Sequence, residues 1–461
     1  MINLSKHKYL IFIGIAILVF ILMRLIDFNG LYGQDSHEYL RYSKHLKNSL
    51  ISLHKPDNYF WPVMYPLIGG LLSLTSIPEV YMLQFISIFA YGITAYYILK
   101  ILDLLYKKSS IIYVVIFFLL SPMVFRLGNE IMSDMLCLSF LTTGFYHLLK
   151  YNSLNKFHSL LYSVLLFSLA FHTRYVSGLI FIIPFFMVFF KNIRKQPVYK
   201  YVLLIVAAIV VSIPHILIKS VSIDTFAHSW LLNWDLRNFF QYEFITSEGL
   251  RSYKLSNLIF VITQSFHPRY FFFGVILIFF SKVKDFKVLL LASILPYLIF
   301  LSGIPFQNSR FILLPFFLFL ILFFPAFNRI LEKLKTKKNV LFLSVAIIQV
   351  LLSIYSFSKV YDLNKEEKRN VMSINKISSH KTIYTSGYEG PLRSYSDKNI
   401  YGLWLDSISN YKSGLLMIND LDMKDKNLPS TIKYNYNTIK NNYKIKKLKT
   451  FEKGWKLYEV Q

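Results

Sequence analysis

The sequence contains a single cysteine among 461 residues, Cys137, and only 25 acidic residues against 51 lysines and arginines. One cysteine excludes an intrachain disulfide framework and a zinc site built from cysteines. No glycine-rich phosphate loop is present, because the nearest stretch, TSGYEG at 385–390, lacks the lysine and the spacing of such a loop. Disulfide-stapled domains and phosphate-loop nucleotide hydrolases are therefore excluded.

Apolar residues dominate what is present: they make up 54% of the chain, charged residues 16%, and the mean hydropathy is +0.44. A run of about 17 to 25 apolar residues can cross a bilayer as a helix. Eleven such spans are predicted, near 9–25, 79–105, 109–126, 132–149, 158–172, 175–190, 200–219, 256–281, 286–304, 311–328 and 339–358. The apolar run at 61–75 is shorter and carries prolines and glycines, so we expect an interfacial or re-entrant segment there. The chain is thus predicted to be a polytopic α-helical membrane protein.

The net charge of +26 is distributed in a way that favours membrane orientation over nucleic-acid binding. Lysines cluster in alternate links between the spans, whereas the short links of the opposite set carry one cation each. Links rich in Lys and Arg face the cytoplasm, so we expect a cytoplasmic N-terminus. The first apolar run has no small-residue cleavage site and is expected to be retained as a span of the cytoplasmic (inner) membrane. Two long links, 26–78 and 220–255, then lie outside, as does the C-terminus.

The composition changes after Ser358, where a polar tail rich in Lys and Asn begins. Short runs typical of strands recur at 382–386, 400–405, 414–419, 443–451 and 455–460. Residues 363–378 and 430–441 have helical patterns. Two domains are therefore predicted: a transmembrane domain over 1–358 and a small extracytoplasmic α/β domain over 359–461.

Asp35 lies where a turn punctuated by Gly30 and Gly33 meets a helical pattern. From Tyr39 onward the larger apolar residues recur every three to four positions and the charged residues take the other face, which predicts an amphipathic helix on the membrane surface. This helix start would hold the carboxylate at the water boundary, directly after a span. Asp35 is therefore the candidate catalytic residue.

Other ionisable residues gather at span ends on the same outer side. Charge near lipid is costly, so its repeated presence on one side indicates a shared polar cavity. The residues in question are Arg24, Asp27, Glu38, Arg126, Glu130, Asp134, His172, Arg174 and Arg310.

The order of these parts resembles the GT-C membrane glycosyltransferases, especially family 39. The resemblance rests on a first span followed by GQDSHEY, then YFWPVMYPLIGGLLSL, NEIMSDMLCLSF, LAFHTRYVSGLIFIIP, NSRFILLPFFLFL and a soluble outer tail. It implies a GT-C-like fold and transfer of a sugar from a polyprenyl-phosphate donor to an extracytoplasmic acceptor of the cell envelope, a lipid, glycan or protein. Members of this family often have Asp-Glu at the first acidic site, where this chain has Asp35 and Ser36.

The residue types fit that chemistry. A carboxylate at Asp35 could accept the proton of an attacking hydroxyl, since general bases of this kind are common. Arg174, Arg310 and Arg24 are candidates for donor-phosphate binding, because a guanidinium forms paired hydrogen bonds with phosphate oxygens.

The remaining acids, Asp134, Glu38 and Glu130, are candidates for binding the acceptor. Asp134 could instead join Asp35 around a divalent cation such as Mg or Mn, which prefers oxygen ligands. Whether the reaction requires a metal stays open at this point.

Structural alternatives exist for each of these residues. Asp35 and Glu38 have the spacing of a capping box, and Asp134 could be a helix N-cap. Arg174 and Arg310 could be interfacial anchors. Among functions, a transporter or flippase of lipid-linked sugars, an oligosaccharide polymerase or ligase and a membrane scaffold are the alternatives to a glycosyltransferase. A transporter would be expected to show similar halves and mid-membrane polar sites, and neither is evident.

The lysine alternation makes one direct prediction about topology. A reporter fused after Ser358 should be exposed outside the cytoplasmic membrane, as measured by its accessibility in intact cells. A cytoplasmic reporter would place Asp35 and the tail on opposite sides and would contradict the proposed site.

Overall fold

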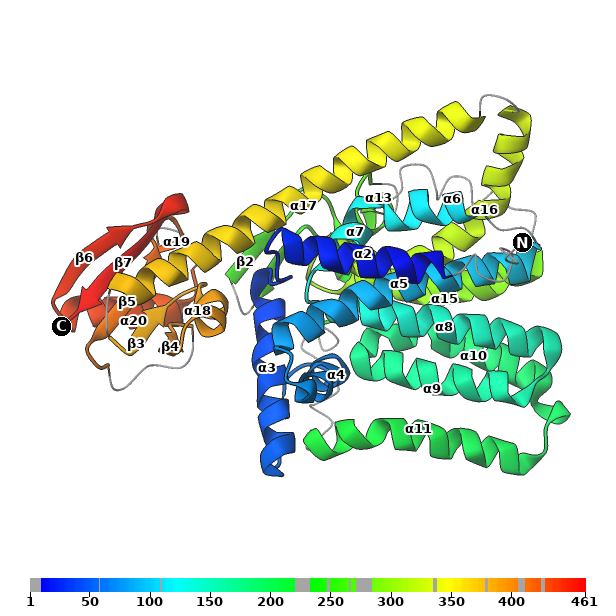
Figure 1. The fold of residues 1–461 in the computed structure, drawn as a ribbon, viewed down its shortest axis with the longest axis horizontal. Coiled ribbons are helices and arrows are strands. Elements are labelled where there is room, and N and C mark those ends of the chain that lie inside the picture. The colour runs from blue at the N-terminus through cyan, green and yellow to red at the C-terminus, as the bar shows by residue number, and fades with distance from the viewer. Residues whose placement is uncertain are drawn as a thin grey trace.

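The structure is a computed structural model that describes residues 10–57, 59–107, 110–219, 233–246, 249–264, 267–270, 284–334, 338–377, 380–404, 411–423 and 428–461. Most of this chain is helical. Figure 1 shows a bundle of long helices, one helix lying crosswise at the end of the bundle, and a sheet beyond that same end.

The bundle consists of helices whose side chains are apolar over most of their length. Its core lies around α16, in which nearly every residue up to Phe327 is buried, whereas α11 is largely exposed and apolar, as a lipid-facing helix is. The long helices are α2 (Ile11–Leu25), α5 (Glu79–Tyr106), α8 (Ser133–Leu154), α9 (Phe157–Thr173), α10 (Gly178–Asn192), α11 (Val198–Ile218), α15 (Lys284–Gly303) and α16 (Leu313–Leu334).

Within the described residues, six helices are long and apolar enough to cross a membrane, or seven if one bent pair is a single span. The predicted total of eleven spans is therefore not confirmed and stays a prediction. The predicted span at 256–281 begins with α13 (Asn257–Gln264), but most of its remainder lies outside the described residues. Part of the predicted outer link 220–255 also lies outside the described residues. The described part contains η6 (Leu236–Phe239) and a hairpin of β1 (Glu243–Thr246) and β2 (Gly249–Ser252).

The predicted span at 109–126 is bent in the structure. α6 (Ile111–Val114) and η2 (Val115–Leu119) are bent by 75° against α7 (Pro122–Asn129). The bend occurs because proline has no amide hydrogen and disfavours helical backbone in the residue before it. The carbonyls freed at the bend are satisfied by distant side chains: the Tyr91 hydroxyl donates to Leu119 O, and Ser353 Oγ donates to Leu120 O at 2.8 Å.

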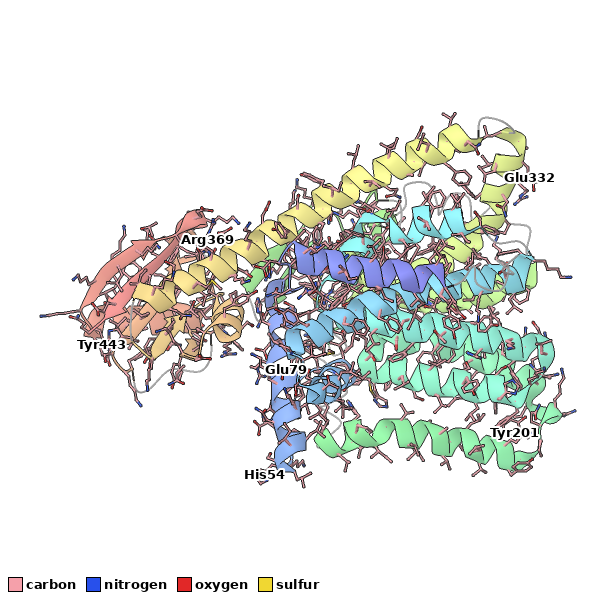
Figure 2. The ribbon with its side chains drawn as sticks, viewed as in Figure 1. His54, Glu79, Tyr201, Glu332, Arg369 and Tyr443 are labelled. Atoms are coloured by element: carbon pink, nitrogen blue, oxygen red, sulfur yellow. The ribbon has the colours of Figure 1, made fainter. Side chains whose placement is uncertain are left out.

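α3 (Gly33–Ser52) is the amphipathic helix predicted from the sequence, and it lies crosswise to α2, α5 and α11 at the end of the bundle (Figure 1). Figure 2 shows His54 and Glu79 at this end and Tyr201 and Glu332 at the opposite end. The segment predicted to be interfacial forms the short helix α4 (Met64–Leu72) followed by η1 (Ser73–Thr75). α4 packs tightly on α3, since a Cβ added to Gly70 would lie 3.0 Å from Ser43 O.

The C-terminal part begins on α17 (Lys338–Ile377), a helix of 40 residues that runs without interruption across the composition change at 358. Beyond it lies a five-stranded sheet in the order β4-β3-β5-β7-β6, flanked by α18 (Glu389–Tyr395), α19 (Asp420–Met423) and α20 (Ser430–Asn442). The strands are β3 (Thr382–Thr385), β4 (Asn399–Gly402), β5 (Gly414–Asn419), β6 (Ile445–Thr450) and β7 (Trp455–Val460). β3 pairs in parallel with β4 and β5, and β7 is antiparallel to both β5 and β6.

The strands thus fall where the sequence pattern places them. The division into domains at 358 and the extracytoplasmic location of the sheet remain predictions.

The sheet domain is docked on α3 through a polar contact around the buried His37. His37 Nδ1 lies 2.7 Å from Ser394 Oγ, and its Nε2 lies 3.7 Å from a carboxylate oxygen of Glu367 on α17. Nearby, the Tyr395 hydroxyl accepts hydrogen bonds from the side-chain amides of Asn29 at 2.9 Å and of Asn364 at 3.2 Å. α3 is therefore held on one side by the bundle and on the other by α17 and α18.

This docking contact leaves no room beside Gly390, where an added Cβ would lie 2.7 Å from the His37 ring. Gly390→Val should therefore force His37 or α18 to move and lower the stability of the domain contact by about 1–3 kcal/mol, the usual cost of overpacking. Faster cleavage near α17 and α18 in limited proteolysis would report it. Gly14→Val is the control, because an added Cβ there meets nothing within 4 Å; equal proteolysis of both variants would show that the contact does not depend on this packing.

Candidate active site

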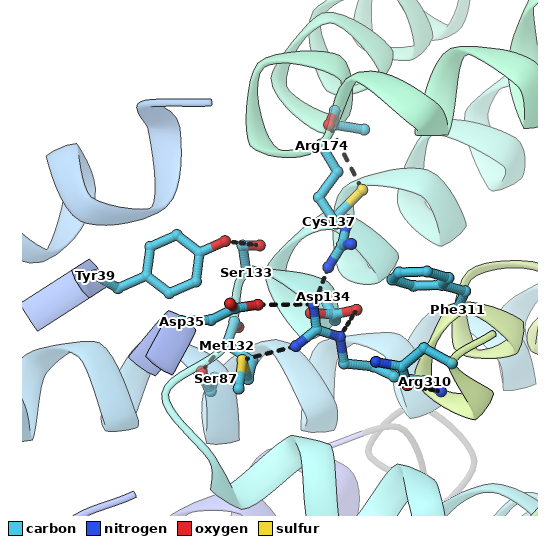
Figure 3. A network of polar contacts seen from close by, with 12 residues as sticks. Asp35, Tyr39, Ser87, Met132, Ser133, Asp134, Cys137, Arg174, Arg310 and Phe311 are labelled. Carbon is cyan, nitrogen blue, oxygen red and sulfur yellow. Dashed lines mark hydrogen bonds and ion pairs between the residues drawn. The ribbon is translucent and has the colours of Figure 1, made fainter. Parts of the chain in front are cut away.

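Four charged side chains from four separate segments meet beneath α3 (Figure 3). Asp35 comes from α3, Asp134 from α8, Arg174 from the residue that ends α9, and Arg310 from the turn η7 (Ser309–Ile312). Arg310 Nη2 lies 2.8 Å from Asp35 Oδ2, and Arg310 Nε lies 3.6 Å from Asp134 Oδ1. Arg174 Nη1 lies 2.5 Å from Asp134 Oδ2. The result is an unbroken chain of alternating charges.

Local sequence places the two acids in the first turns of their helices. Tyr32, with extended backbone, is the N-cap of α3, and its amide donates to Ser36 Oγ at 2.7 Å. Gly33, with φ +67°, is the first helical residue, a backbone conformation that favours glycine. Asp35 is therefore the third residue of the helix, and its side chain makes no cap, so the capping-box alternative is wrong. Asp134 likewise lies one position inside α8, whose N-cap is Met132.

The arginines are held by the backbone on either side of them. The Asn308 side chain accepts from the Arg310 amide at 3.0 Å, which begins η7, and the Tyr270 hydroxyl donates to Ser309 O at 2.8 Å. The Arg174 amide donates to Ala170 O at 2.9 Å as α9 ends. The Phe311 ring lies 5.8 Å from the Arg174 guanidinium carbon and 5.7 Å from that of Arg310, so it packs beside both cations.

Two cations and two anions neutralise one another in this chain, although they differ in exposure. The side chain of Asp134 is 1% exposed, Arg174 13%, Arg310 17% and Asp35 30%. The positive ends of helices α3 and α8 further stabilise the two carboxylates. Asp134 is thus the buried anchor of both arginines, and Asp35 is the member most open to a ligand.

Tyr39 adds a polar group that sequence reasoning missed, because it was taken only for part of the apolar face of the helix. Its hydroxyl lies 2.7 Å from Ser133 Oγ, next to Asp134 in the chain. Burial, with a further contribution from the Asp35 carboxylate, raises the pKa of Tyr39 to about 12. The phenol is therefore neutral near pH 7 and able to donate a hydrogen bond. Its position four residues after Asp35 was the available signal.

Three of the predicted residues make their contacts outside this chain of charges. Glu130 is fully buried and pairs with Arg126 at 2.6 Å. Glu38 pairs with Arg41 at 2.8 Å and with Arg393 of α18 at 3.4 Å. Arg24 donates to Phe28 O, and its guanidinium lies 4.6 Å from the centre of the Tyr81 ring.

A metal between Asp35 and Asp134 does not fit this arrangement, because the Arg310 guanidinium contacts both carboxylates. Among the described residues, no group of three or more His, Cys, Asp or Glu side chains is placed to share a metal ion. We derive no step through a metal, and the requirement for Mg or Mn stays an untested prediction.

Comparison with known proteins gives one family and one fold. The model of the Alg9-like mannosyltransferase family matches residues 42–395. The fold is similar to that of ArnT from Cupriavidus metallidurans bound to undecaprenyl phosphate, with 8% identity, a TM-score of 0.59 and coverage of 98% of this chain and 97% of that chain. ArnT from the same organism in the apo state is 9% identical, with a TM-score of 0.60 and coverage of 99% of this chain and 98% of that chain. A search of curated protein sequences gave no significant match.

The burial of Asp134 between two arginines predicts a stability effect. Asp134→Ala would leave both guanidiniums without their shared counter-charge and should lower the free energy of unfolding by about 3–5 kcal/mol, the cost of breaking a buried pair. Thermal unfolding of the detergent-solubilised protein measures the change. Glu452→Ala is the matched control, because the pair of Glu452 with Arg369 is exposed on both sides and should contribute little. Equal melting temperatures for the two variants would contradict the anchoring role.

Proposed function

Because this chain belongs to the Alg9-like mannosyltransferase family, we propose that it transfers a sugar from a polyprenyl-phosphate donor to an acceptor. The chain is a membrane glycosyltransferase of the GT-C superfamily. The assignment to family 39, transfer on the outer side of the cytoplasmic membrane and inversion at the sugar carbon are parts of the proposal. The transporter and scaffold alternatives are set aside by the family.

The contact of Arg310 with both Asp35 and Asp134 is the observation that carries the mechanism. A polyprenyl-phosphate sugar must present its phosphate to a cation, and ArnT, which shares this fold, has been crystallised with undecaprenyl phosphate. Arg310 is anchored by Asp134 on one side and reaches the more exposed Asp35 on the other. The donor phosphate would take the place of Asp35 as a partner of Arg310, because guanidinium binds phosphate oxygens in a forked geometry.

Displacement of Asp35 from Arg310 would have a chemical consequence. The donor phosphate would occupy the guanidinium, so both oxygens of the Asp35 carboxylate would be available as the acceptor arrives. Asp35 would accept the proton of the acceptor hydroxyl while that oxygen forms a bond to the anomeric carbon. The bond from this carbon to the phosphate oxygen breaks, and polyprenyl phosphate leaves as a stable anion, so no acid is required.

The other polar groups have supporting roles in this scheme. Asp134 is nearly fully buried and bonded to both arginines, so it is better suited to orient them than to touch an acceptor. Arg174 keeps Asp134 paired while Arg310 exchanges partners. The neutral Tyr39 phenol, beside Asp134 and near Asp35, could donate to a sugar or phosphate oxygen.

The location of the site supports reaction at a membrane surface. α3 lies crosswise at the end of the helical bundle, with the sheet domain beyond it (Figure 1). The charges meet where Asp35 of α3 contacts the bundle residues Arg310 and Asp134 (Figure 3). A lipid-linked donor in the bilayer and an acceptor from the water phase could both reach such a position. The lysine distribution in the links supports the outer side.

Asp35→Asn separates the proposed base from a purely structural residue. The amide keeps the volume of the side chain and can still accept a hydrogen bond from Arg310, but it cannot accept a proton usefully. Sugar transfer from the polyprenyl-phosphate donor should therefore fall by roughly a hundredfold or more with the protein level unchanged. Transfer is measured by mass spectrometry of cell-envelope lipids and glycans from cells that express each variant.

The control is Asp27→Asn, an equivalent change in an exposed carboxylate paired with Lys368 at 2.7 Å, where transfer should be unchanged. A well-folded Asp35→Asn enzyme with wild-type transfer would end the assignment of Asp35 as the base. A smaller loss would indicate an acceptor that is already ionised and needs no base.

A further inference from the structure

We propose that the cavity between α3 and α18 binds a phosphate group of the acceptor, an inference that rests on the proposed transfer reaction. The cavity has a volume of about 290 Å³. Its polar lining comes from Arg41, Lys44, His45, Asn48, Arg393 and Ser394. None of these residues belongs to the chain of charges at Asp35.

Positive charge exceeds negative charge around this cavity. Arg41 and Arg393 share one carboxylate, that of Glu38, at 2.8 Å and 3.4 Å. Lys44 is exposed and has no hydrogen bond or ion pair with any part of the chain that the structure describes. Three cations thus face the carboxylate of Glu38, and the Asp57 carboxylate lies 3.5 Å from His45 Nε2, so an anion entering the cavity would meet a net positive field.

The donor types favour phosphate over a simple counter-ion site. The Arg41 guanidinium bonds Glu38 through Nε, which leaves its terminal nitrogens for a ligand, whereas the terminal nitrogens of Arg393 also donate to Glu38 and to Ile400 O. Lys44 adds a point charge, and the Asn48 amide is a neutral donor at the same wall. His45 is occupied otherwise, since its Nε2 accepts from the Asp57 amide at 3.0 Å. Several oxygens on one group would be needed to use these donors together, as a phosphate provides.

The two walls of the cavity are fixed relative to each other. α3 carries Arg41 and Lys44, and α18 carries Arg393 and Ser394. The two helices are joined by the hydrogen bond of Ser394 with His37 and by the pair of Arg393 with Glu38. The cations are therefore preorganised, which reduces the entropy lost when an anion binds.

The cavity and the proposed base lie on the same helix. Asp35 and Arg41 are six residues apart, about 9 Å along the helix axis, with Glu38 on the turn between them. The volume is at the lower end for small-ligand pockets, so it would hold a head group and leave the rest of the acceptor outside. Asp35 and Lys44 lie on opposite faces of α3, so an acceptor held by its phosphate here would have to extend around the helix, about 10 Å across, to bring a hydroxyl to Asp35.

A binding experiment tests the cavity without any turnover. The full-length protein in detergent is mixed with phosphatidylglycerol or phosphatidylcholine, and the bound lipids per chain are counted by native mass spectrometry. The wild type should retain one more phosphatidylglycerol than phosphatidylcholine, and Lys44→Gln/Arg393→Gln should weaken that one binding event at least tenfold. The control is Lys446→Gln/Lys447→Gln on the exposed surface of β6, which removes the same charge elsewhere and should bind as the wild type does.

Arg393 also contributes to docking, so Lys44→Glu alone serves as a second variant. Lys44 makes no bond within the described chain, and this single reversal should weaken phosphatidylglycerol binding with an unchanged melting temperature. If millimolar pyrophosphate displaces phosphatidylglycerol, the site binds the phosphate group alone, as a soluble phosphorylated glycan would present it. If the lipid stays bound, the site recognises a lipid head group. Either result supports the phosphate site.

Equal retention of the two lipids by the wild type, or undiminished phosphatidylglycerol binding in both variants, would overturn the inference. Failure of the proposed function is a separate outcome, because it would appear as absent sugar transfer in a protein whose cavity still binds phosphatidylglycerol.

Discussion

The pairing of Arg310 with Asp35 and Asp134 is the interaction on which the site depends. The pair of Arg310 with Asp35 joins residues that are 275 positions apart in the chain. It holds the amphipathic helix α3 against the end of the bundle. Charges this close to a lipid environment are tolerated only when they neutralise one another. In the proposed reaction, the donor phosphate would displace the Asp35 carboxylate from Arg310.

The surface helix α3 connects this chemistry to the rest of the molecule. Its inner face carries Asp35 and Tyr39, and its outer face carries His37, Glu38 and Arg41, which contact α17 and α18. Substitution of a residue in the sheet domain can therefore change the position of the carboxylate. The membrane bundle and the C-terminal sheet are therefore coupled through α3 as well as through the continuous helix α17.

Several features of the fold and the site could be predicted from the sequence. The strands of the tail follow its apolar alternation, and Asp35, Asp134, Arg174 and Arg310 do lie together, because charged residues at span ends on one side must share a polar space. Arg24 does not join them, since its guanidinium is used by Phe28 O and the Tyr81 ring. Span ends alone could not show which charges pair. Their catalytic and binding roles remain predictions.

The missed features depend on partners far away in the chain. The bend before Pro122 is stable because Tyr91 and Ser353 satisfy the carbonyls that it frees, and no local pattern indicates those partners. The buried His37 was read only as a residue of a surface helix, because its contacts come from residues 367 and 394. At 358 the composition changes but the helical backbone does not, since Lys, Glu and Asn continue a helix whose apolar face still finds a partner.

The uninterrupted α17 has a mechanical consequence. A helix of 40 residues is about 60 Å long, roughly twice the thickness of a bilayer core. It begins next to α16 and ends beneath the sheet, so it acts as a stiff lever whose far arm carries the docked domain (Figure 1). Because Glu367 near its far end lies 3.7 Å from His37, a change in the tilt of α17 would be transmitted to the helix that carries Asp35.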